Sequence, residues 1–429
     1  MVQRRESDGV VKAGRVAQPG AMLSAEHGPA VAIARRAAQR LRAGHLWVYR
    51  SDVESLLPGP GAEKIVGGAL VTVMDGRGIP LGSGLYSMAS QISVRMVSRE
   101  ARISRKQFLA EVRERVSGAL RRRDELVSEG DACRLIFSEG DGLPGIVADR
   151  YNDLVILQLL TQGTAQEDVR SAVVEVLSAR FPEATVWERP DPRIRELEEL
   201  GPASAEALYS KGAAKSATVF KINGVRFSYD VGAGQKTGAF LDQRLNYAVA
   251  ASYAKGVALD VCTYQGGFAL HMAQRCERVT GVDASRAALE VADSNLELNP
   301  GLAAQVDWIE ADAFELLREY DATEQRFDTI VLDPPAFAKS KRAVEGALRG
   351  YKEMNLRAMK MLRDGGTLVT CSCSHHVSPE VFRGIVAAAA ADAGRRVQVL
   401  ESRGAAPDHP DVLTLPETNY LKCLICRVG

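Results

Sequence analysis

The C-terminal half of the chain repeats one pattern: a short apolar run, a turn, and then a segment with helical periodicity. The expected strands cover residues 256–262, 278–283, 306–312, 327–335, 366–374, 396–402 and 420–428. The expected helices cover residues 266–276, 285–298, 313–320, 351–363 and 379–393. This alternation predicts an α/β fold, a mainly parallel sheet with helices on both faces. Ligands of such sheets bind beyond the carboxyl ends of the strands, so the residues that end each strand are the first candidates for a site.

The N-terminal half has a different texture, with short β-type runs followed by a mixture of strands and helices. In addition, Asn223–Gly224 separates two alternating runs, which is a strong signal for a hairpin. At 429 residues the chain is too long for one ordinary core. We therefore expect a disordered basic tail (1–27), a β-barrel-like domain (28–100), a central α+β domain (101–198), a linker with a β-hairpin (199–232) and the α/β domain (233–429).

Charge and cysteine usage set further limits. Formal net charge is zero, yet residues 1–50 carry nine Arg/Lys against three Asp/Glu, which indicates either a polyanionic partner or a solvated basic surface. No stretch reaches eighteen consecutive apolar residues, so we expect a cytoplasmic protein without a membrane partner. The seven cysteines are irregularly spaced, which predicts free thiols. Cys423 and Cys426 lie on an alternating strand and should face opposite ways, so no metal is expected there.

Acidic residues close successive strands of the α/β half. Asp260 ends the first strand and precedes Gly266–Gly267, where a ligand can approach bare backbone N–H groups. Asp283 ends the second strand, where a carboxylate can accept hydrogen bonds from ribose hydroxyls, and Asp312 ends the third. Any one of these aspartates is as well explained as a turn or a helix cap. Together, and without a phosphate-binding loop, they predict a nucleoside cofactor that lacks phosphates, S-adenosylmethionine.

The fourth and fifth strands end in groups that suggest a reaction. Asp333-Pro334-Pro335 is similar to the loop that holds an exocyclic amine in amino-methyltransferases, although Ala336 stands at the position of the usual aromatic residue. Cys371 and Cys373 end the next strand, and a thiolate there permits methylation of carbon 5 of a pyrimidine. Cys373 is the better candidate because Cys371 should remain inside the strand. A buried cysteine and a metal ligand are the alternatives for Cys373.

Five stretches carry a resemblance to a known family: "GHLWVYR", "EGDGLPGIVADRY", "GQKTGAFLDQR", "LDPPAFAKSK" and "CSCS". In these stretches the chain resembles bacterial large-subunit ribosomal RNA cytosine-5 methyltransferases, class I enzymes with an N-terminal PUA domain. The resemblance implies a Rossmann-like domain of seven strands, the last antiparallel, preceded by a PUA domain and a small α+β domain. It implies S-adenosylmethionine as cofactor and ribosomal RNA as partner.

The resemblance also implies roles for residues of this chain. Cys373 is the implied nucleophile, and Asp333 is the implied group that orients the cytosine. The residues implied in cofactor binding are Asp260, Tyr264, Gly266, Gly267, Phe268, Asp283, Asp312 and Arg244, the last for the methionine carboxylate. The residues expected to contact the substrate are Pro334, Pro335, Phe337 and Lys339.

Three functions remain open at this point. The first is RNA cytosine-5 methylation, which needs a single-stranded or flipped base. The second is methylation of an exocyclic amine through the Asp333 loop, and the third is RNA binding without catalysis. Glu417 is a candidate for the base that removes the carbon 5 proton. His375 and His376 could favour the thiolate, touch RNA phosphate, or do neither. Monomer and homodimer are both compatible with the sequence.

Overall fold

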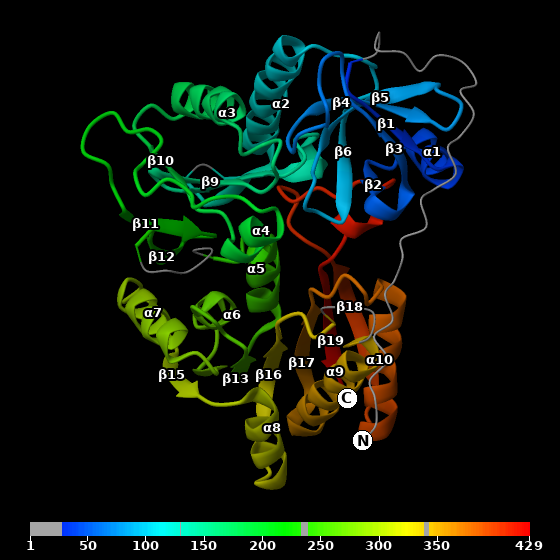
Figure 1. The fold of residues 1–429 in the computed structure, drawn as a ribbon. Helices are drawn as coiled ribbons and strands as arrows, with labels where there is room; N and C mark the ends of the chain where they lie inside the picture. Colours follow the sequence, from blue (N-terminus) through cyan, green and yellow to red (C-terminus); the bar gives the residue numbers. More distant parts are fainter. Residues whose placement is uncertain (1–27, 129, 233–238, 339–342) are drawn as a thin grey trace, which may run out of the picture.

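The N-terminal domain is a six-stranded sheet in a computed structural model that describes residues 28–128, 130–232, 239–338 and 343–429 (Figure 1). Its strands run in the order β2-β6-β5-β4-β1-β3. They are β1 (Ala30–Ile33), β2 (Trp47–Tyr49), β3 (Val53–Leu57), β4 (Leu70–Asp75), β5 (Pro80–Tyr86) and β6 (Ile92–Ser98), with α1 (Arg35–Arg42) after β1. Alternate apolar side chains such as Val31, Ile33, Val71 and Val73 form the core of this domain.

The central domain is a four-stranded sheet with two helices on one face. Its strand order is β10-β9-β8-β7. The elements are α2 (Arg105–Leu126), β7 (Cys133–Phe137), β8 (Ile146–Tyr151), β9 (Leu154–Leu159), α3 (Glu167–Arg180), β10 (Thr185–Glu188) and α4 (Pro192–Leu197). Along β9 the side chains alternate between two cores: Val155 and Leu157 pack with the helices, whereas Leu154 and Ile156 pack on the opposite side. Both faces of this sheet are therefore covered.

The hairpin predicted at Asn223–Gly224 is confirmed. β11 (Ala217–Ile222) pairs antiparallel with β12 (Val225–Asp230), and both turn residues have positive φ, 49° and 84°, as a two-residue hairpin turn requires. The hairpin packs against both neighbours. The ring of Phe220 makes an edge-to-face contact with that of Tyr151 in the central sheet, while the backbone N–H of Ser228 donates to Asn295 of the C-terminal domain.

The C-terminal domain contains the predicted α/β sheet, which confirms the expected fold. Its seven strands run β15-β14-β13-β16-β17-β19-β18, and the last strand in sequence, β19, is antiparallel to both neighbours. The strands are β13 (Val257–Val261), β14 (Arg278–Asp283), β15 (Gln305–Glu310), β16 (Phe327–Leu332), β17 (Leu362–Ser372), β18 (Val397–Arg403) and β19 (Lys422–Val428). No helix within the described ranges is long and apolar enough to cross a membrane.

Helices cover both faces of this sheet. One core holds α5 (Arg244–Tyr253) and α6 (Gly267–Met272), and the other holds α8 (Ala313–Ala322), α9 (Val344–Met361) and α10 (Pro379–Ala393). α7 (Arg286–Glu297) follows β14. Two boundaries differ from the sequence prediction. α6 ends four residues earlier than expected, and α9 begins seven residues earlier, through two glycines. Gly350 is one of them, and a Cβ atom there would make ordinary van der Waals contacts with Phe314 and Phe337.

The segment between β18 and β19, residues 404–421, joins all three domains. It is the red connection in Figure 1 that rises from the C-terminal sheet toward the N-terminal domain. Thr414 Oγ1 donates to the carbonyl of Gly44, 2.8 Å away, and Asp408 accepts from the backbone N–H of Arg134 in the central sheet. The segment then leads directly into β19, so the three domains meet beside the strand ends of the C-terminal sheet.

Candidate active site at the strand ends

The parallel register of the C-terminal sheet brings the predicted acidic residues to one edge. Val261 of β13 is level with Val282 of β14 and with Leu332 of β16, which in turn is level with Thr370 of β17. These strands therefore end at the same edge of the sheet. Asp283 is the last residue of β14, Asp333 and Cys373 directly follow the last residues of β16 and β17, and Asp260 lies one residue inside this edge. The side-chain period of two places Asp333 and Cys373 on the face that packs against α5 and α6.

Asp260 is a buried carboxylate with one oxygen that lacks a partner. Oδ2 accepts hydrogen bonds from Thr263 Oγ1 (2.6 Å) and from the backbone N–H of Ala269 (2.9 Å). Oδ1 is buried and has no hydrogen-bond partner among the residues that the structure describes. Burial raises the pKa of Asp260 to about 7, against the lowering effect of these two bonds. A buried acceptor without a partner is costly, so a donor brought by a ligand would stabilise it.

The glycine turn after β13 has the geometry that a close ligand approach requires. Gly266 precedes α6 with φ of 86°, and Tyr264 also has positive φ, 53°. A Cβ atom on Gly267 would lie 2.6 Å from the ring of Tyr247, so only glycine fits. Phe268 follows and is buried, with its ring at 4.7 Å from that of Tyr247. The turn is thus pressed against α5 and leaves backbone N–H groups at a helix start.

Asp283 and Asp312 differ in their surroundings. Asp283 is half-buried: Oδ2 accepts from the backbone N–H of Tyr264, and Oδ1 accepts from that of Ser285, both at 2.9 Å. These bonds tie the end of β14 to the glycine turn. Asp312 is exposed, and its Oδ1 accepts from the first two available N–H groups of α8. Both of these hydrogen bonds cap the start of α8, a function that any strand-end aspartate can have.

A small cavity lies between the glycine turn, α5 and the end of β16. Its lining includes the aromatic rings of Phe240, Tyr247, Tyr264 and Phe268 and the carboxyl of Asp333. Phe240 is 47% exposed and stands beside Tyr264, with ring centroids 5.0 Å apart. The cavity therefore combines aromatic faces with acidic and backbone groups, a composition that suits a nucleoside.

The partners of Arg244 differ from the cofactor carboxylate that the sequence analysis assigned to it. Its side chain is 3% exposed, and Nε lies 3.2 Å from both carboxylate oxygens of Asp408. A second guanidinium nitrogen, Nη2, contacts the carbonyl of Leu126. The guanidinium is therefore committed to the junction with the 404–421 segment. We remove Arg244 from the set of cofactor-binding residues.

Cys373 lies directly beyond β17, beside the Asp333 loop. Its thiol contacts the carbonyl of Pro334, with Sγ and O 3.9 Å apart. Burial and the charges of Asp333 and Asp242 raise the pKa of the thiol to about 11, and the charge of Lys422 opposes them. Asp333 is half-buried, and burial together with the charges of Asp242 and Asp260 raises its pKa to about 8. Gln243 donates a hydrogen bond to Asp333. A thiol and a carboxyl that retains its proton at neutral pH thus lie side by side.

The remaining cysteines of this region belong to the core. Cys371 is fully buried inside β17 and lies opposite Cys423 of β19. Cys423 and Cys426 pack into different cores, on opposite faces of the sheet, which confirms the alternation read from the sequence. No group of three or more His, Cys, Asp or Glu side chains within the described ranges could hold a metal ion.

The other residues predicted to contact the substrate differ in their burial and in their contacts. Pro334 is buried and Pro335 is exposed at the mouth of the loop. The ring of Phe337 packs against Tyr351 (4.8 Å between centroids) and Phe314 (5.8 Å), which is a core contact. Lys339 lies outside the described residues. Glu417 accepts a hydrogen bond from Tyr49 of the N-terminal domain through its carboxylate, and its carbonyl contacts Nδ1 of His375.

Sequence reasoning missed three polar residues that meet here. Asp242 accepts a hydrogen bond from Tyr420, and Gln243 contacts Asp333. Lys422 is 5% exposed and donates to two backbone carbonyls beside Cys373. Asp242 and Gln243 had a signal in the sequence, since both lie in the stretch "GQKTGAFLDQR" that carries part of the resemblance, whereas nothing in the sequence links Lys422 to Cys373.

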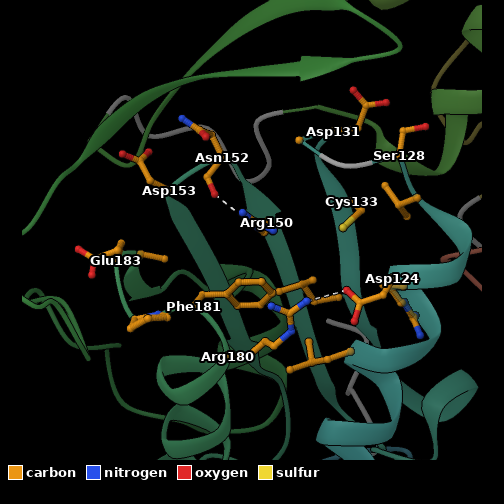
Figure 2. Close-up of a pocket in the computed structure, with 17 residues that line it drawn as sticks. Asp124, Ser128, Asp131, Cys133, Arg150, Asn152, Asp153, Arg180, Phe181 and Glu183 are labelled. Carbon is orange, nitrogen blue, oxygen red and sulfur yellow. Dashed lines mark hydrogen bonds and ion pairs between the residues drawn. The ribbon is translucent and has the colours of Figure 1, made fainter.

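A second cavity lies at the edge of the central sheet, away from these strand ends (Figure 2). The guanidinium carbons of Arg150 and Arg180 lie 4.5 and 5.1 Å from the centroid of the Phe181 ring. Arg180 also pairs with Asp124. Three other charged residues of the lining pair with residues outside it: Arg123 with Asp141, Asp153 with Lys215 and Glu183 with Lys211. The cavity contains none of the site residues predicted from the sequence.

Comparisons with known proteins agree with this geometry. Residues 143–427 match the family described as S-adenosylmethionine-dependent methyltransferase. The chain belongs to this family. Residues 31–99 match a PUA-like domain, which places that domain on the six-stranded sheet. The cofactor of this methyltransferase is therefore S-adenosylmethionine, and the site fits it: Asp260 offers a buried unpaired acceptor, and Gly267 offers a turn that no side chain could share.

Curated relatives are similar over nearly the whole chain. The "Ribosomal RNA large subunit methyltransferase I" of Shewanella denitrificans is 38% identical over 390 residues, which is 90% of this chain and 95% of that protein. The proteins of the same name from Shewanella amazonensis and Escherichia coli O157:H7 are 40% and 36% identical, with the same two shares covered.

Solved structures share the fold. One is described as a methyltransferase complexed with SAH. Its TM-score is 0.76 at 18% identity, and the match covers 92% of this chain and 99% of that one. A designated SAM-dependent methyltransferase from Streptococcus mutans has the same values.

Proposed function

We propose that this methyltransferase modifies carbon 5 of a cytosine in large-subunit ribosomal RNA through a covalent bond between Cys373 and carbon 6. The names of the curated relatives support large-subunit ribosomal RNA as the substrate. The observation that supports the cytosine-5 chemistry is the position of the Cys373 thiol, 3.9 Å from the Pro334 carbonyl and next to Asp333.

The chemistry needs a nucleophile because carbon 5 of cytosine does not attack a methyl group unaided. When the Cys373 thiolate adds to carbon 6, a sulfur–carbon bond forms and the electrons of the 5,6 double bond move toward carbon 5 and the ring. S-adenosylmethionine, when bound, supplies the electrophilic methyl group that carbon 5 then takes. Carbon 5 next loses its proton to a base, the double bond returns, and the thiolate leaves. Cysteine and carbon 6 are thus restored to their starting bonds.

Asp333 is suited to stabilise the charge that this addition creates. A carboxyl group with a pKa of about 8 keeps its proton at neutral pH. It can donate this proton toward the ring nitrogen N3, while its other oxygen accepts from the exocyclic amine. Negative charge that develops in the ring is thereby stabilised, and cytosine is oriented with carbon 6 toward the thiol.

The cofactor is assigned to the glycine turn and the ends of the first three strands. The proposed residues are Asp260, Tyr264, Gly266, Gly267, Phe268, Asp283 and Asp312. Asp283 is the proposed acceptor for the ribose hydroxyls, since its carboxylate is fixed by two backbone N–H groups. The PUA-like domain is the proposed anchor for the RNA, with the base flipped or single-stranded at the strand ends.

The test is to map 5-methylcytosine in large-subunit ribosomal RNA from cells with and without this protein. One cytosine should lose its methyl group in the cells that lack the protein and regain it when the gene is restored. Loss of a methylated exocyclic amine, with every 5-methylcytosine retained, would refute the proposal.

A further inference from the structure

We propose that Lys422 is a positioning residue for Cys373, which holds the turn after β17 and stabilises the thiolate with its ammonium group. The inference rests on the proposed function, because it concerns the ionisation of the proposed nucleophile. It assigns a role to a residue that neither the motif at Asp333 nor the cysteine motif contains.

The first observation is how Lys422 reaches the turn. It begins β19 and pairs with Ser372, the last residue of β17. Its Nζ donates to the carbonyl of Ser374 and to the carbonyl of Tyr420, both at 2.7 Å. Two of the three ammonium donors therefore fix the backbone on either side of the site. One of these carbonyls belongs to the residue directly after Cys373.

The second observation is that the same turn is fixed from the opposite direction. The hydroxyl of Ser374 lies 2.9 Å from that of Tyr351 in α9, and it accepts from the backbone N–H of Ala338 at 3.3 Å. Ser374 thus connects the turn to the end of the Asp333 loop, while Lys422 holds its carbonyl. The residue directly after Cys373 is thus held through both its hydroxyl and its carbonyl, which is support that a precisely placed nucleophile requires.

The third observation is the charge balance around the thiol. Asp333, after β16, and Asp242, before α5, both raise the pKa of Cys373, whereas the charge of Lys422 lowers it. The charge of Cys373 in turn raises the pKa of Tyr351 in α9 and of Tyr420 in the 404–421 segment. The charge of Lys422 also lowers the pKa of His375, two residues after Cys373.

Lys422 itself lacks a carboxylate partner. Within the described part of the chain, its Nζ donates to two backbone carbonyls and forms no ion pair with an aspartate or glutamate, although the side chain is buried. Burial lowers the pKa of Lys422 to about 8, and the charge of Cys373 opposes that lowering. A buried ammonium is stabilised most by an anion nearby. The thiolate of Cys373 is the anion that catalysis would form at this place.

The test measures alkylation of Cys373 by iodoacetamide in the full-length protein, without RNA, as a function of pH. The Cys373 peptide is followed by mass spectrometry, so the other six cysteines do not interfere. The variants are Lys422→Met, which removes charge and donors, Lys422→Gln, which removes charge but keeps donors, and Lys422→Arg, which keeps the charge. Cys426→Ala is the control, because it alters a buried residue on the same face of β19 without changing charge.

We expect the apparent pKa of Cys373 to rise by about one unit or more in Lys422→Met and Lys422→Gln, which slows alkylation at pH 8 about tenfold. Lys422→Arg should restore most of the rate, and Cys426→Ala should match the unaltered protein. An unchanged pH profile in Lys422→Gln would overturn the inference. Should Lys422→Met unfold, Lys422→Gln and Lys422→Arg still decide the question. The assay needs no methyl transfer, so this result is independent of whether the proposed RNA reaction is correct.

Discussion

The thiol of Cys373 contacts the backbone carbonyl of Pro334, with 3.9 Å between Sγ and O, although 39 residues separate them in the sequence. The contact joins the end of β17 to the loop after β16. It sets the proposed nucleophile beside a carboxyl group, that of Asp333, whose pKa is raised to about 8. Both groups lie on the side of the sheet on which the glycine turn lies, so the proposed cofactor site and the proposed reaction site adjoin each other.

Asp333→Asn should lower kcat/KM for RNA about 100-fold, because an amide cannot transfer a proton toward the cytosine ring. Turnover of the unaltered enzyme should decline as the pH rises through about 8, where Asp333 loses its proton. That alkaline decline should be absent from the variant. A methyl-transfer assay across pH 6 to 10 checks both statements, and a variant within threefold of the unaltered enzyme would contradict them.

Asp283→Ala should weaken binding of S-adenosylmethionine about tenfold or more, measured by calorimetry. The change removes the proposed ribose acceptor and releases the N–H groups of Tyr264 and Ser285. Asp293→Ala is the matched control, because Asp293 is an exposed aspartate on α7, the helix that follows β14. Equal affinities for the two variants would show that Asp283 does not contact the cofactor.

Much of the C-terminal fold could be predicted because its signals are local. Alternating apolar runs mark strands, and parallel strands bring their carboxyl ends to one edge, so Asp260, Asp283, Asp333 and Cys373 could be grouped without coordinates. The hairpin at Asn223–Gly224 was predictable for the same reason, since the turn type depends on two residues.

Contacts between distant segments were not predictable in this way. The direction of Arg244 depends on Asp408, 164 residues later, in a segment whose path is set by the other two domains. The sequence shows an arginine near the cofactor loop but not which acid it meets. Lys422 likewise becomes notable only when β19 is paired with β17, which brings it beside the turn that carries Cys373.

The Arg244–Asp408 pair gives a stability prediction. Arg244→Met or Asp408→Asn should each lower the free energy of unfolding by about 3–5 kcal/mol, because each leaves a buried charge without its partner. The double variant should lose less than the sum of the two. Denaturant titration measures these values. S-adenosylmethionine should bind folded Arg244→Met within threefold of the unaltered affinity, and a loss above tenfold would return Arg244 to the cofactor site.

The same pair predicts that the fold loses stability at acidic pH. Burial alone would raise the pKa of Asp408, but His409 and Arg244 hold it at about 2, below its usual 3.8. A carboxylate with a lowered pKa stabilises the fold at pH values above the unfolded pKa, and this contribution disappears as the pH falls from about 4 to about 2. Asp408→Asn should therefore flatten the loss of stability in that range, and an unchanged slope would argue against the pair.

The central claim is the covalent bond between Cys373 and cytosine. The most direct measurement is to incubate the protein with S-adenosylmethionine and large-subunit ribosomal RNA that contains 5-fluorocytosine, which blocks loss of the proton from carbon 5. A stable protein–RNA adduct should form, with the modified peptide at Cys373. Cys371→Ala should still form it, because Cys371 is buried within β17, whereas Cys373→Ala should not. Methyl transfer at an undiminished rate by Cys373→Ala, without an adduct, would contradict the account.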